Sequence, residues 1–84
     1  MITFFQKLSR QNPQNIDYRL SLGQAYFLDG QKEQALKIWR AVYRASPPNL
    51  TRYRLVGLTL IRLNLYNEAI AVFREALQKV NNKE

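Results

Sequence analysis

The 84-residue chain contains no cysteine and no histidine, and only three glycines and three prolines. Without cysteine there are no disulfide bonds, thiolate metal sites or cysteine nucleophiles, and without histidine the commonest metal ligand and general base are missing. So few glycines and prolines do not supply the turns of an all-β sandwich. The chain is one small domain or a fragment of a larger array, and we expect no metal and no cofactor.

Catalytic patterns are missing as well. The six carboxylates are scattered along the chain, no glycine-rich phosphate loop is present, and no histidine is available to activate a serine. We therefore predict that the chain is not an enzyme.

Long hydrophobic runs are also missing. No run reaches the roughly 18 apolar residues that a membrane span requires, and the segment Met1–Phe5 is too short for the core of a signal peptide. We expect a soluble protein, most simply a cytoplasmic one, unless a targeting or anchoring segment precedes Met1.

Acidic residues are scarce: six Asp and Glu stand against 13 Lys and Arg, which gives a formal net charge of +7. No acidic residue lies between Glu33 and Glu68, so most of the positive excess falls in the middle of the chain. This basic midsection is either a solvated face or a surface that favours an acidic partner, such as a protein segment, a nucleic acid or an anionic membrane.

An internal repeat organises what is present. Residues of the same or a similar kind recur at a spacing of 34 residues. The matching pairs are too numerous to be due to chance. The matching residues are Pro13 and Pro47, Gly23 and Gly57, Gly30 and Asn64, Ala35 and Ala69, and the aromatic series Phe5, Trp39 and Phe73.

Within the repeat, apolar spacing predicts one amphipathic helix over Asp17–Leu28 and another over Glu33–Ala45. Gly30, and Asn64 one period later, are residue types that adopt the left-handed conformation with which helices end. The residues predicted to cap helix N-termini are Asn15, Asn49 and Asn67.

Gly23 and Gly57 lie inside predicted helices, where a glycine costs about 1 kcal/mol relative to alanine. Their matching places require a structural reason. We predict that each allows close packing of two helix backbones, with Gly23 facing Ala35 and Gly57 facing Ala69.

In these residues the sequence resembles the tetratricopeptide repeat (TPR) family. The first full repeat carries Leu22-Gly23-x-x-Tyr26, Ala35-x-x-x-Trp39 and Pro47. The second carries Tyr53-x-x-Val56-Gly57-x-x-Leu60 and Ala69-x-x-x-Phe73. The departures from the family pattern are Arg19 in place of a large aromatic, Leu60 in place of a tyrosine, and Asn81 in place of a second proline.

The resemblance implies an all-α fold of about five helices, in which antiparallel helical hairpins stack into a short right-handed superhelix. It places a half repeat at residues 1–15 and full repeats at 16–49 and 50–83.

The resemblance further implies a protein-interaction module with a concave groove lined by the first helix of each repeat. The matching groove positions are Asp17, Leu20, Gln24, Phe27, Thr51, Arg54, Leu58, Ile61 and Arg62. An exposed row of apolar residues indicates an interface, and Arg54 and Arg62 give it a positive rim suited to carboxylates. The alternative is that Phe27 and Ile61 only pack against neighbouring first helices.

One subgroup of the family holds the carboxylate of a chaperone tail with a Lys and an Asn in one repeat and basic residues in later ones. Here Leu20 and Gln24 occupy the matching first-repeat places, and of the clamp only Arg54 remains. A groove of mixed apolar and basic character suits instead an amphipathic helix or an extended peptide with acidic flanks.

A second hypothesis is a nucleic-acid-binding helical repeat that uses the basic midsection, since some helical-hairpin repeats read one base each. Against it, Arg40 and Arg44 fall on a second helix and Arg54 and Arg62 on a first, so the charge is divided between faces. Association with a membrane surface through the same residues is a third option.

The two ends of the repeat array lack a polar capping helix, which repeat arrays need. We therefore expect either a fragment of a longer protein or a homo-oligomer formed through the ends, which light scattering over a dilution range tests. The apolar residues expected to mediate self-association are Ile2, Phe4, Ile70 and Leu77.

Overall fold

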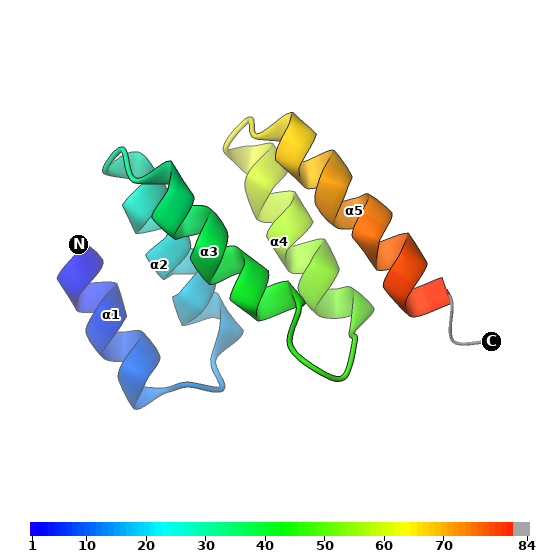
Figure 1. Ribbon diagram of the computed structural model, residues 1–84. Coiled ribbons are helices and arrows are strands. Elements are labelled where there is room, and N and C mark those ends of the chain that lie inside the picture. The colour runs from blue at the N-terminus through cyan, green and yellow to red at the C-terminus, as the bar shows by residue number, and fades with distance from the viewer. Residues whose placement is uncertain (82–84) are drawn as a thin grey trace. The chain divides into compact units, whose positions relative to one another are not determined.

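The computed structural model describes residues 1–81, and these form five α-helices and no strand (Figure 1). The helices are α1 (Ile2–Gln11), α2 (Ile16–Leu28), α3 (Lys32–Tyr43), α4 (Leu50–Arg62) and α5 (Tyr66–Asn81). The predicted all-α fold of helical hairpins is confirmed. The chain divides into two compact units, Met1–Val42 and the part that begins at Tyr43.

The helix bounds repeat along the chain. Helices α2 and α4 both contain 13 residues and begin at Ile16 and Leu50, one repeat period apart. Helix α3 ends at Tyr43, two residues before the predicted Ala45, and the loop that contains Pro47 follows it. The predicted repeat bounds at 1–15, 16–49 and 50–83 and the predicted superhelix stay predictions.

Asparagine caps start the two equivalent helices. The side-chain oxygen of Asn15 accepts a hydrogen bond from the Tyr18 amide at 3.2 Å, and that of Asn49 accepts one from the Thr51 amide at 2.8 Å. Both predicted caps are confirmed, because each satisfies an amide that a helix start leaves without an intrahelical partner. The third was wrong: α5 begins at Tyr66, so Asn67 lies inside its first turn.

The two hairpin turns share one geometry. Gly30 has φ +85° and Asn64 has φ +63°, as predicted from residue types that tolerate the left-handed region. In the first turn the Gln31 amide donates to the Tyr26 carbonyl at 2.9 Å, and in the second the Leu65 amide donates to the Leu60 carbonyl at 2.8 Å. Each bond closes the helix end in the manner of a Schellman motif.

In the first unit, α2 and α3 form a hairpin and α1 lies beside α2 (Figure 1). The fully buried Trp39 of α3 donates from its indole nitrogen to the Leu20 carbonyl of α2 at 3.3 Å. The amide of Gln6 in α1 donates to the Tyr26 hydroxyl of α2 at 2.7 Å. Helix α1 itself buries no residue fully, whereas α2 and α3 each do.

In the second unit, α4 and α5 form the equivalent hairpin. Its buried side chains recur along α4 at helical spacing and meet alanine and valine of α5. They are Tyr53, Val56, Leu60, Ala69, Val72 and Ala76. Thr59 of α4 is a buried polar side chain, and its hydroxyl donates to the Leu55 carbonyl at 2.9 Å, so the hydroxyl is satisfied.

The two helix-interior glycines contact aromatic rings, and the predicted partners Ala35 and Ala69 were wrong. A Cβ at Gly23 would lie 2.6 Å from Cε2 of Trp39, and a Cβ at Gly57 would lie 2.7 Å from Cε1 of Phe73. Both distances are far below van der Waals contact, so each glycine makes room for the large ring of its partner helix.

Across residues 1–81, no helix is both long and apolar enough to cross a membrane.

Candidate functional site

The predicted groove residues of the second repeat lie on one exposed face of α4. Thr51, Arg54, Leu58, Ile61 and Arg62 follow one another at helical spacing, and all five are exposed. Leu58 is 49% exposed and Ile61 is 41% exposed. The core of this unit is built by the opposite face of α4, so the hairpin does not need these two apolar side chains.

The predicted groove residues of the first repeat lie on α2 and are more covered. Asp17 is exposed, whereas Leu20, Gln24 and Phe27 are half-buried. Gln24 lines a small cavity of 160 Å³ together with Met1 and Phe5, so the N-terminal part of α1 lies over this end of the stripe. The face of α4 is therefore the stronger candidate for a contact surface.

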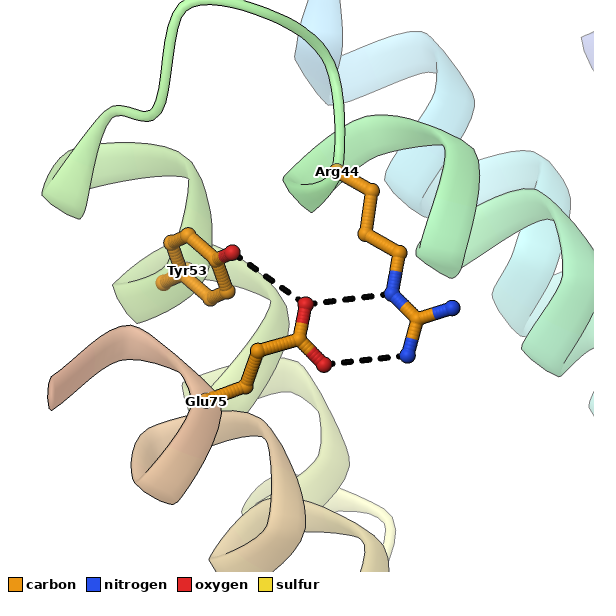
Figure 2. Close-up of polar contacts among 3 residues, drawn as sticks. All are labelled: Arg44, Tyr53 and Glu75. Atoms are coloured by element: carbon orange, nitrogen blue, oxygen red, sulfur yellow. Dashed lines mark hydrogen bonds and ion pairs between the residues drawn. The ribbon is translucent and has the colours of Figure 1, made fainter. Parts of the chain in front are cut away.

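A hydrogen-bonded cluster joins three segments of the second unit (Figure 2). The Arg44 guanidinium donates to both carboxylate oxygens of Glu75, from Nε at 3.1 Å and from Nη2 at 2.9 Å. The hydroxyl of Tyr53 donates to the same carboxylate at 3.2 Å. The ring of Tyr53 also packs against the ring of Tyr43, with the centroids 5.2 Å apart.

The cluster shifts the ionisation of its members. Hydrogen bonding from Arg44 lowers the pKa of Glu75 below its usual 4.5, although burial opposes this. The same hydrogen bond raises the pKa of Arg44. Burial, followed by the negative charge of Glu75, raises the pKa of Tyr53 above its usual 10.0. These directions match a structural ion pair in which Tyr53 stays neutral and donates.

The matching place in the first unit is open. One repeat period before Tyr43 and Tyr53 stand Ser9 and Arg19, and one period before Glu75 stands Ala41. A cavity of 620 Å³ occupies the space beside Ser9 and Arg19. Its lining residues are Gln6, Ser9, Arg10, Pro13, Arg19, Leu22, Tyr26, Gln34 and Ile38.

Sequence reasoning missed this cavity. The departure at Arg19 was visible in the sequence, but it carried no functional expectation. The sequence signal for this site is a pair of differences between the two repeats. Ser9 stands where the next repeat has Tyr43, and Arg19 stands where it has Tyr53, so the first unit lacks two neighbouring rings.

The residues predicted to mediate self-association differ in exposure. Phe4, Ile70 and Leu77 are exposed, and Ile2 is half-buried. Leu77 lines an apolar cavity of 270 Å³ with Leu50, Phe73, Ala76 and Val80. Self-association through these residues stays a prediction.

Within residues 1–81 no group of three or more Asp and Glu side chains is placed to hold a metal ion.

Comparison with known proteins identifies a family. The model of the family described as anaphase-promoting complex, cyclosome, subunit 3 matches residues 2–76. No match was found among curated proteins or among solved structures. That family is of the TPR type, and the helical hairpins, their repeated bounds and the glycine–aromatic contacts agree with it. The chain therefore belongs to the family of anaphase-promoting complex, cyclosome, subunit 3, and is a TPR-like repeat protein.

Proposed function

We propose that this chain is a protein-interaction scaffold and that the exposed face of α4 binds a helix or extended peptide of a partner protein. The observation that carries the proposal is the pair Leu58 and Ile61, exposed on α4 beside Arg54. Family membership supports a scaffold, because TPR-type repeats are protein-interaction modules.

The spacing of the side chains on this face indicates which partner segment would fit it. Leu58 and Ile61 are neighbours on the helix surface, and Arg54 precedes Leu58 by one turn. The step from Arg54 to Ile61 is two helical turns, which is about 10 Å along the axis. A partner helix with two apolar side chains one turn apart and a carboxylate at one end matches that arrangement.

Charge supports a partner of acidic character. Among residues 1–81, no carboxylate forms an ion pair with Arg54, and its side chain is exposed. A partner carboxylate therefore meets a guanidinium that has no competing partner in the described part of the chain. The apolar contact supplies most of the affinity, and the arginine selects the partner and its orientation.

Self-association is the second part of the proposal. Phe4 and Leu77 are exposed apolar side chains in different units, and Ile70 precedes Leu77 by two helical turns on α5. Light scattering of the free protein over a wide dilution range precedes any binding experiment. A single monomeric species at every concentration would contradict this part and leave the α4 face unaffected.

The α4 face is tested by titrating ¹⁵N-labelled protein with an amphipathic helical peptide of Leu, Ala and Glu and with its Gln counterpart. We expect amide shifts that gather on Leu58 and Ile61, and affinity at least tenfold lower for Arg54→Glu, since one lost charge pair becomes a like-charge contact. Arg74→Glu on the exposed side of α5 changes the net charge equally and serves as the control. Equal affinity of the two variants would refute the proposed site.

A further inference from the structure

The cavity of the first unit has the dimensions of a ligand site. Its 620 Å³ lies within the range of about 300–1,000 Å³ that is typical of sites for small molecules. The residues that line it include the apolar or aromatic residues Leu22, Tyr26 and Ile38 and the polar residues Gln6 and Arg19. An apolar body with one polar end fits such a lining.

The second unit shows what fills the equivalent space when the chain itself supplies the groups. Tyr43 and Tyr53 place two packed rings there, and Glu75 places a carboxylate against Arg44. The repeat therefore has a place for an aromatic ring next to an arginine-bound carboxylate.

The first unit keeps the arginine and lacks the other groups. Arg10 stands one repeat period before Arg44 and lines the cavity, whereas Ser9, Arg19 and Ala41 replace the two tyrosines and the glutamate. Among residues 1–81, no carboxylate forms an ion pair with Arg10 or Arg19. The Ser9 hydroxyl oxygen is buried and has no hydrogen-bond partner, and Ser9 is one of the residues that line the cavity. A buried polar group of this kind is rare in native proteins and marks a place where a partner atom is missing.

We propose that this cavity is a second binding site, which takes an aromatic side chain and an adjacent carboxylate from a segment of a partner protein. The ring occupies the space that Tyr43 and Tyr53 fill in the second unit, and the carboxylate pairs with Arg10 and Arg19. The site belongs to the first unit and is independent of the α4 face.

The positive charge of the arginines that line the cavity favours an acidic occupant. Two arginines, Arg10 and Arg19, are among the residues that line one cavity, and arginine binds carboxylates through two parallel hydrogen bonds, as Arg44 binds Glu75. A neutral aromatic segment leaves both cations without a partner, so it binds more weakly.

Three capped hexapeptides test the proposal by NMR titration of the whole chain. One carries a central Glu-Tyr, one Gln-Tyr and one Glu-Ala, each flanked by Gly and Ser. We expect the Glu-Tyr peptide to shift the side-chain amide of Gln6 and the backbone amides of Arg10 and Arg19. Replacing either the carboxylate or the ring is expected to weaken binding at least tenfold, because each fills a separate part of the cavity.

Variants separate this site from the α4 face. Arg10→Gln and Arg19→Gln are each expected to lower the affinity for the Glu-Tyr peptide at least fivefold, and Arg54→Gln is expected to leave it unchanged. Unchanged affinity in both cavity variants, or shifts that gather on α4, would overturn the proposal whether or not the α4 face binds its own peptide.

Filling the cavity gives the converse result. The double variant Ser9→Tyr with Arg19→Tyr restores the ring pair of the second unit, so we expect a higher melting temperature and loss of peptide binding. Undiminished binding in a folded double variant would contradict the site. If 3-(4-hydroxyphenyl)propionate, which carries the same ring and carboxylate, binds as tightly as the peptide, the occupant is a small molecule and the partner segment is wrong.

Discussion

The two units carry the same hairpin but differ in how they use one position of the repeat. In the second unit this position is Tyr53, which is 2% exposed, packs on Tyr43 and donates to Glu75. In the first unit it is Arg19, and a cavity of 620 Å³ lies beside it. Both units keep the glycine that seats an aromatic ring, the left-handed turn and the asparagine cap. A repeat can therefore lose a pair of core rings while the contacts that form its hairpin remain.

This difference between the units contrasts a position that stabilises the fold with one that leaves space for a ligand. A buried ring contributes to stability through the apolar surface and the contacts that it removes from water. The first unit lacks the contribution of these rings to stability. It has instead a cavity that Arg10 and Arg19 help to line. Three changes test how far the two units differ, beginning with the one expected to have the largest effect.

Truncating the repeat position is expected to affect the two units very differently. Tyr53→Ala should lower the free energy of unfolding by about 3–5 kcal/mol, because it empties a fully buried place in the core. Arg19→Ala should change it by less than about 0.5 kcal/mol, because the space beside Arg19 is already open. Urea denaturation followed by circular dichroism measures both. Tyr53→Phe keeps the ring and isolates the hydrogen bond to Glu75; equal losses for the two alanine variants would remove the contrast.

The matched glycines should respond in the opposite order. A Cβ at Gly23 meets the buried Trp39, whose indole is also anchored to the Leu20 carbonyl, so the ring has no room to move. A Cβ at Gly57 meets the ring end of the half-buried Phe73, which can turn away. We expect Gly23→Ala to lose about 2–3 kcal/mol. For Gly57→Ala we expect about 1 kcal/mol, since the higher helix propensity of alanine offsets part of the clash.

The control for this pair is Gly30→Ala. No atom lies within 4 Å of a Cβ added at Gly30, so only the positive φ of +85° is unfavourable. It reports the backbone cost alone, about 1–2 kcal/mol. If Gly57→Ala proved more destabilising than Gly23→Ala, the explanation from ring mobility would be wrong.

The ion pair should give the second unit a pH dependence that the first unit lacks. The pKa of Glu75 is lowered in the folded state, so the stability it contributes is present above its usual 4.5 and is lost as pH falls through the lowered value. The positive groups that act on it are Arg44 and Lys79, and Tyr53 donates to it. Because the Arg44 side chain is 55% exposed, the contribution is small, about 0.5–1 kcal/mol.

Glu75→Gln tests this dependence. The difference in unfolding free energy between the original chain and the variant should be largest near about pH 7 and should shrink as pH falls through the lowered pKa of Glu75, because the carboxylate is then protonated. Salt at about 1 M should reduce the difference at neutral pH. A difference that does not vary between acid and neutral pH would show that Glu75 acts through packing rather than charge.

Much of the local structure followed from the sequence because its causes are local. Asparagine caps, left-handed turn residues and the apolar period each involve residues within one or two helical turns. This is why Asn15, Asn49, Gly30 and Asn64 were predicted correctly. Asn67 was wrong because residue type alone does not place a helix start when the preceding turn already determines where the chain reverses direction.

The contacts between helices were less predictable. Small residues at matching places indicated close packing, but which side chain faces each glycine depends on the rotation of two helices about their axes. The structure brings the rings of Trp39 and Phe73 there instead of Ala35 and Ala69. The Arg44–Glu75 pair joins two residues far apart in the chain, and no spacing rule for a single helix predicts such a contact.

The sequence by itself determined that this protein is a helical repeat, because one period recurs in the residue types that stop, cap and pack helices. Through the resemblance to the TPR family, the sequence also predicted a set of α4 residues that are exposed in the structure. Only the tertiary structure decided that the space beside the repeat position is filled by two rings in the second unit and is open in the first. Whether a missing ring leaves a cavity depends on how far the surrounding helices close over the space, and that is a property of packing in three dimensions.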